Sequence, residues 1–190
     1  MDNNQMLRAK NYLFEFDQIT NQMTNIIFSN KITNDISSYF INCMIPHHQA
    51  AIYICQNLLR YSSYNPLRNV ANNIIRMLTD GIEQMQAILK STSTVNNSND
   101  DVSFYSNTFF NVVTAMITKM VGSHRTYNID LNFISEMIPH HQGAIDMCNN
   151  LIKYQIDPNL YNVAMNIIKE QSRGIAQLRE FGKGLYNNGQ

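Results

Sequence analysis

The sequence predicts an all-α fold made of two copies of one helical unit. Proline and glycine are scarce, at four and seven of 190 residues, and apolar residues recur at helical spacing nearly throughout, as in amphipathic helices. No segment alternates apolar and polar residues between turn dipeptides, the pattern typical of β-hairpins. The third observation is a repeat: at a shift of 93 residues without a gap, residues 16–85 match residues 109–178 at 28 of 70 positions.

Two copies of one unit usually form one body, because each copy alone cannot bury its apolar face. We therefore expect a single domain over residues 1–190, with the two repeats related by a pseudo-twofold axis. Repeat one spans about residues 4–90 and repeat two about residues 104–186. A chain of this length buries a sizeable core in one domain.

Each repeat is predicted to hold three helices. In repeat one, a Thr33-Asn34-Asp35 cap signal precedes the second helix and Pro66 lies near the start of the third. Residues 91–103 are polar and of low complexity, so they are predicted to be a linker. Asn128 and Pro158 mark the starts of the last two helices. The predicted helices are therefore about 4–29, 35–62, 66–90, 104–122, 129–155 and 158–186.

Composition limits the partners and the compartment. Lys plus Arg and Asp plus Glu both number 14, so there is no basic excess with which to bind nucleic acid or an anionic membrane. No run reaches the roughly 18 apolar residues of a membrane span, and the first 17 residues do not resemble a signal peptide. Three cysteines do not indicate a disulfide framework. We expect a cytoplasmic protein with reduced thiols, and the sequence leaves a homo-oligomer open.

The motif Met-Ile-Pro-His-His-Gln occurs twice, at residues 44–49 and 137–142, and holds four of the five histidines. Helical spacing places His48 in the middle of the apolar stripe and His47 at its edge. The second repeat reproduces this placement with His141 and His140. We expect His48 and His141 to be buried and the other two to be less so. A proline inside each of these helices frees a carbonyl one turn earlier and favours a kink beside the histidines.

The motif indicates a soft-metal site. Met, His and Cys in an apolar setting suit Cu(I), whereas hard cations prefer oxygen donors. The predicted partner is thus a metal ion, most simply copper, and the protein is more simply a binder than an enzyme. Met23 and Met116, at equivalent positions, fit packing better than ligation. The alternative is a structural or interaction bundle whose core histidines are satisfied by hydrogen bonds. The candidate ligands are Met44, His47, His48, Met137, His140 and His141, with Cys55 and Cys148 as secondary candidates.

The pattern Phe-Ile-x-x-Met-Ile-Pro-His-His-Gln-x-Ala, followed by a helix with Val-Ala-x-Asn-Ile-Ile and a second copy of the whole, resembles the bacterial domain of unknown function 305 family. This resemblance implies a ferritin-like antiparallel bundle in which the second and third helices of each repeat form four central helices. It also implies copper binding by Met and His.

The chain departs from the family pattern in the third helix of each repeat. Where that pattern has a Glu, both copies have a glycine, Gly81 and Gly174. A glycine inside a helix is unfavourable, so we expect close helix contact or room for an opposing side chain at both positions. Di-iron chemistry is disfavoured, because the chain has five Glu and no Glu-x-x-His. Nucleophilic catalysis by Cys148 lacks an accompanying oxyanion-hole loop.

Overall fold

The protein is described by a computed structural model that covers residues 3–91 and 95–187, within which every regular element is a helix and none is a strand. The all-α prediction is therefore confirmed for this part of the chain. The helices are α1 (Asn3–Ser29), α2 (Ile36–Tyr61), α3 (Asn65–Lys90), α4 (Asn99–Val121), α5 (Ile129–Leu151) and α6 (Pro158–Asn187).

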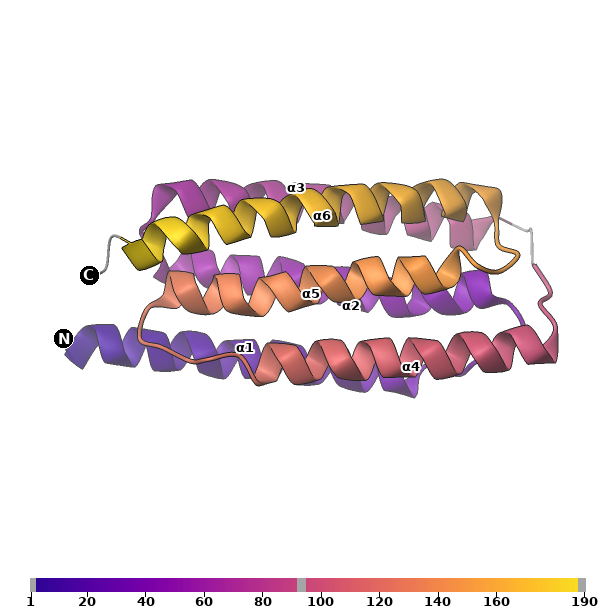
Figure 1. Cartoon of the computed structure of the whole chain (residues 1–190), viewed down its shortest axis with the longest axis horizontal. Helices are drawn as coiled ribbons and strands as arrows, with labels where there is room; N and C mark the ends of the chain where they lie inside the picture. The colour runs from indigo at the N-terminus through magenta and orange to yellow at the C-terminus, as the bar shows by residue number, and fades with distance from the viewer. Residues whose placement is uncertain (1–2, 92–94, 188–190) are drawn as a thin grey trace.

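The six helices form three layers of two, and consecutive helices run antiparallel (Figure 1). Helices α2 and α5 make the middle layer and contact each other, with α3 and α6 on one side and α1 and α4 on the other. Within a closed ring, α2 contacts α3, α3 contacts α6, α6 contacts α5 and α5 contacts α2. Each layer thus pairs one helix of repeat one with its equivalent in repeat two, and the middle pair is covered on both faces.

The starts of α2 and α5 follow the predicted cap residues. The carboxylate of Asp35 accepts a hydrogen bond from the backbone N–H of Ser38, and the Asn128 side chain accepts from two backbone N–H groups of α5. Such side chains satisfy donors that have no partner within the helix. Both helices continue through their internal prolines. The Asn42 carbonyl, which Pro46 leaves without its usual donor, accepts a hydrogen bond of 3.0 Å from the Asn30 side chain.

The linker predicted over residues 91–103 is shorter than expected. Helix α4 begins at Asn99, where Ser98 caps the first turn and two aspartates follow at a favourable end of the helix dipole. Asn97 is buried, and its side chain binds the backbone of both Ile36 and Gln155. Residues 92–94 lie outside the described residues. The polar residues of this stretch therefore do more than connect two helices: Ser98 caps α4, and Asn97 links the start of α2 to the segment before α6.

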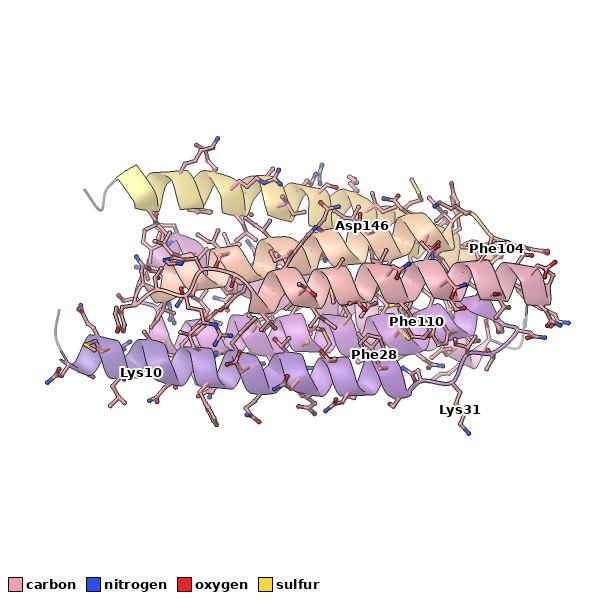
Figure 2. The ribbon with its side chains drawn as sticks, turned by 60° about the horizontal axis from the view of Figure 1, so that its bottom comes forward. Lys10, Phe28, Lys31, Phe104, Phe110 and Asp146 are labelled. Carbon is pink, nitrogen blue, oxygen red and sulfur yellow. The ribbon has the colours of Figure 1, made fainter. Side chains whose placement is uncertain are left out.

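Helices α1 and α4 meet along the outer layer through aromatic contacts. The rings of Phe28 and Phe110 stack with centroids 5.8 Å apart and planes within 12° (Figure 2). Within residues 3–91 and 95–187, no helix combines the length and apolar character that crossing a lipid bilayer requires. Helices α1 and α4 contact α2 and α5, respectively, and so cover one face of the two helices that carry the motif histidines.

Candidate metal centre

All four motif histidines are buried in the middle layer. Their exposed fractions are 0% for His47, 1% for His48, 1% for His140 and 0% for His141. Burial of His48 and His141 was expected. The expectation that His47 and His140 would be less buried is wrong, because α2 and α5 pack against each other and against a layer on each side. The edge of the apolar stripe is therefore covered as well as its middle.

The two repeats meet through their first motif histidines. The rings of His47 on α2 and His140 on α5 stack with centroids 3.8 Å apart and planes tilted by 30°. Within each motif the two rings are farther apart, with centroids at 6.0 Å for His47 and His48 and 6.3 Å for His140 and His141. The doubled motif therefore forms one imidazole cluster rather than two separate histidine pairs.

The second histidine of each motif faces a glycine of the neighbouring outer helix. A Cβ placed on Gly81 of α3 would lie 3.3 Å from Cδ2 of His48, and one placed on Gly174 of α6 would lie 2.7 Å from Cδ2 of His141. Real Cβ atoms essentially never approach as closely as the second distance. The expected room for an opposing side chain is confirmed at both positions, and the opposing side chain is a motif histidine.

Met116 of α4 also belongs to the cluster. Its sulfur lies 3.2 Å from Nε2 of His47. This contact depends on Gly143, where an added Cβ would lie 2.3 Å from the Met116 sulfur. Helical spacing favoured packing for Met116, so reasoning from sequence missed this contact. The alignment of the two repeats contained a signal. Met23 and Met116 are equivalent, and Ala50 of repeat one is matched by Gly143 of repeat two. Met23 therefore lies near a residue with a Cβ, whereas Met116 lies against one without it.

Burial keeps the imidazoles neutral. Desolvation lowers the pKa of His48 to about 4 and that of His141 to about 3, with the His48 ring adding to the second shift. Desolvation and then the neighbouring imidazoles lower the pKa of His47 and His140 well below the usual value. Neutral imidazole is the form that binds metals, so the cluster is in a ligating state at neutral pH without losing a proton.

Several ring nitrogens of the cluster have no hydrogen-bond partner among the described residues. This holds for Nδ1 of His48 and for both ring nitrogens of His141, whereas the rings of His47 and His140 each interact with the backbone of the other residue, which opposes part of the lowering of their pKa. Buried polar atoms are rarely left in this state, and each costs free energy. In the described part of the chain, no three His, Cys, Asp or Glu side chains gather closely enough to hold a metal ion. Any metal held here therefore needs methionine sulfurs as donors in addition to the imidazoles.

The other candidate ligands are buried on the same two helices. Met44 and Met137 have exposed fractions of 0% and lie one turn before the histidines. Cys55 and Cys148 are buried free thiols, and burial raises the pKa of both well above the usual value, which disfavours the thiolate. The structure does not join either thiol to the histidines in a group of three donors.

Glu136 is a second buried titratable site, one residue before Met137. Its carboxylate accepts a hydrogen bond of 2.7 Å from the Tyr12 hydroxyl. Desolvation raises the pKa of Glu136 to about 8, although this hydrogen bond and the charge of Arg125 oppose the shift. Repeat one has Cys43 at the equivalent position, where burial raises the thiol pKa to about 11. Nothing in the sequence alone placed Tyr12 opposite Glu136.

Comparison with known proteins agrees with this architecture. The family model described as Domain of unknown function (DUF305) matches residues 17–89 and 38–182. The chain belongs to this family. As a DUF305 member it is also similar to two solved structures, each with a TM-score of 0.58 and covering 79% of this chain. One is CopM in the Ag-bound form obtained by soaking, at 28% identity and 96% of that chain. The other is CopM in the Cu(II)-bound form, at 27% identity and 97% of that chain. No curated protein matches this DUF305 chain.

Proposed function

We propose that this protein is a non-catalytic binder of a soft metal ion, copper in its Cu(I) state, at the imidazole cluster between α2 and α5. One observation carries the proposal: four buried, neutral histidines from two repeats lie together, and Nδ1 of His48 and both ring nitrogens of His141 lack hydrogen-bond partners among the described residues. A buried polar atom without a partner is unfavourable in the free protein, and a metal ion supplies the missing partner. The similarity to CopM structures bound to Ag and to Cu(II) supports this proposal.

The donor set favours copper over harder metals. Imidazole nitrogen and thioether sulfur bind Cu(I), whereas Mg²⁺, Ca²⁺ and Mn²⁺ prefer carboxylate and carbonyl oxygens. Gly81 and Gly174 bring no carboxylate to the second histidines. A ferritin-like di-iron centre would need several inward-facing Glu side chains. We propose the ligands Met44, His47, His48, Met137, His140 and His141, joined by Met116, with Cys55 and Cys148 as secondary donors.

In this proposal the fold holds the ligands in fixed positions and catalyses no reaction. We infer that the two repeats form a ferritin-like arrangement about a pseudo-twofold axis passing near the stacked His47 and His140 rings. The layers on both sides of α2 and α5 bury all four imidazole rings of the cluster. Three buried free cysteines fit a reducing cytoplasm, which also keeps copper as Cu(I). Sequestration of copper fits this arrangement better than turnover does.

A structural bundle with satisfied core histidines is the alternative. It predicts that each imidazole finds hydrogen-bond partners inside the core, as buried polar groups usually do. The ring nitrogens of His141, which have no partner among the described residues, argue against it. Each such nitrogen makes the metal-free folded protein less stable, and a purely structural role does not explain this loss of stability.

Anaerobic titration with Cu(I) under a competing chelator tests the function. The variants are His47→Ala with His48→Ala, His140→Ala with His141→Ala, and all four changes together. His124→Ala is the matched control, because His124 is exposed and lies outside both motifs. We expect tight binding by wild type and His124→Ala, and none by the quadruple variant, whose fold is checked by circular dichroism. Because His47 and His140 stack at 3.8 Å, we expect each double variant alone to abolish binding at one shared site. Equal affinity of wild type and a folded quadruple variant contradicts the proposal.

A further inference from the structure

A cavity of about 390 Å³ lies between α3 and α6, on the side of the molecule away from α1 and α4. Its lining includes His48 from the middle layer and Gly81 beside it. Exposed residues such as Asn73 and Asn166 also line it, so it connects the surface with the imidazole cluster. His141, the equivalent of His48, does not line it.

A buried amide lines this cavity next to His48. Gln171 is 2% exposed, and its Oε1 has no hydrogen-bond partner among the described residues. The equivalent residue in repeat one is Leu78, which lines the same cavity. An unpaired buried carbonyl oxygen is costly, and nothing in the packing requires it, since leucine serves at the equivalent position. The oxygen is therefore available to a cation or hydrogen-bond donor that enters the cavity.

The charges that line the cavity favour a cation. Asp80 and Glu170 contribute two carboxylates against the single guanidinium of Arg76. Glu170 also pairs with Arg173 at 3.0 Å and with Lys169 at 4.0 Å, so Asp80 is the carboxylate that remains to attract a cation. Opposite charge along a narrow opening raises the local concentration of a cation and its rate of entry.

A second pocket, between α4 and α5, reaches the cluster less directly. It has a volume of about 290 Å³ and is lined by Met116, whose sulfur stands between the pocket and His47. Its charged residues are Lys119 and Asp146, and the Asp146 carboxylate accepts a hydrogen bond of 2.9 Å from Gln142. The positive charge of Lys119 is balanced by a single carboxylate that is already hydrogen-bonded, so this pocket does not attract a cation. No histidine lines it.

We propose that the α3–α6 cavity is the port through which the metal ion enters and leaves, with Gln171 as a transient donor on the way to His48. This inference rests on the proposed copper binding and adds its route. A port sets rates without setting affinity: narrowing it slows entry and exit by the same factor, so the dissociation constant is unchanged. Kinetics and equilibrium therefore separate the route from the site.

Three substitutions of one type test the route. Asn166→Phe narrows the α3–α6 cavity, Asn111→Phe narrows the α4–α5 pocket, and Asn72→Phe places the same side chain on α3 outside both. All three positions are exposed, so the fold should tolerate each change. The measurement is anaerobic stopped-flow transfer of Cu(I) from a coloured chelate, together with the equilibrium constant of each variant.

We expect Asn166→Phe to lower the association rate constant about tenfold, within the range over which rates vary among variants of one site, with an unchanged dissociation constant. Asn111→Phe and Asn72→Phe should behave as wild type, and Gln171→Leu should slow entry without loss of affinity. Slowing by Asn111→Phe instead of Asn166→Phe, or wild-type rates in all three, overturns the route while leaving the site intact. Absence of Cu(I) binding by the wild type overturns the site, and the route with it.

Discussion

The sulfur of Met116 on α4 lies 3.2 Å from Nε2 of His47 on α2, although the two residues are 69 positions apart in the sequence. This contact joins an outer helix of repeat two to the motif of repeat one. Within the described residues, neither ring nitrogen of His140 has a methionine sulfur as partner, so the imidazole cluster is asymmetric in its sulfur donors.

Met116→Leu should weaken Cu(I) binding while leaving the fold stable. Leucine keeps the approximate volume but removes the thioether, and volume-conserving apolar exchanges usually cost less than about 1.5 kcal/mol in stability. We expect affinity to fall on the order of tenfold, about 1.4 kcal/mol, in chelator-competition titrations. Met23→Leu is the matched control because Met23 is equally buried at the equivalent position. Equal losses in both variants would show that Met116 has no special part in binding.

Gly143→Ala should destabilise the protein through Met116. The added Cβ would lie 2.3 Å from the Met116 sulfur, and overpacking of this kind costs about 1–3 kcal/mol. Alanine gains about 1 kcal/mol of helix propensity over glycine, so we expect a net loss of about 1 kcal/mol by urea unfolding. In a Met116→Ala background the close contacts with the Met116 sulfur and Cγ are removed and only the Cβ at 3.0 Å remains, so the same change should destabilise much less. Gly184→Ala, with nothing within 4 Å of its Cβ, is the control and should not destabilise in either background.

Gly174→Ala should be more harmful than Gly81→Ala. The added Cβ meets His141 at 2.7 Å in the first case and His48 at 3.3 Å in the second. The ring of His141 must move, whereas that of His48 needs to yield only a few tenths of an ångström. We expect Gly174→Ala to lower both the unfolding free energy and the Cu(I) affinity, and Gly81→Ala to change each much less. Thermal unfolding with and without Cu(I) measures both effects, and the reverse order of the two variants would contradict the geometry.

Stability should fall as the pH rises from 6.5 to 8 because of Glu136. Its pKa of about 8 in the folded protein lies above the ordinary value of 4.5, so between these two pH values the folded state holds a proton that the unfolded state has lost. Stability from this group is complete below about pH 4.5 and decreases up to about pH 8, by at most about 1.4 kcal/mol per pH unit. The buried histidines act in the opposite direction, because their lowered pKa makes stability rise with pH up to about 6.5. Glu136 therefore dominates the interval above that value.

Urea unfolding of the metal-free protein at pH 6.5 and pH 8 measures this loss, which should approach about 2 kcal/mol. Glu136→Gln should flatten the dependence, since glutamine can still accept the Tyr12 hydrogen bond without titrating. The exposed Glu83→Gln is the control and should keep the wild-type slope. Parallel curves for wild type and Glu136→Gln would place the pH dependence elsewhere.

Local properties of the chain were predicted well from the sequence alone. The helical period and the caps at Asp35 and Asn128 depend on residues that are close to one another in the sequence. The repeat was found by direct comparison of two segments that share an identical hexapeptide. Burial of His48 followed from its place in the middle of an apolar stripe. The glycines at positions 81 and 174 indicated room for an opposing side chain, because glycine inside a helix is retained against its propensity only where a neighbour needs the space.

Relations between helices were decided only by the tertiary structure. A helical period tells which face of α2 is apolar but not which helices cover its edge, so the burial of His47 and its stack on His140 could not be read from the sequence. The same holds for Met116 beside His47 and for Tyr12 beside Glu136, whose partners come from other helices. Side-chain spacing is fixed along a single helix by 3.6 residues per turn, whereas contacts between helices depend on how all six pack at once.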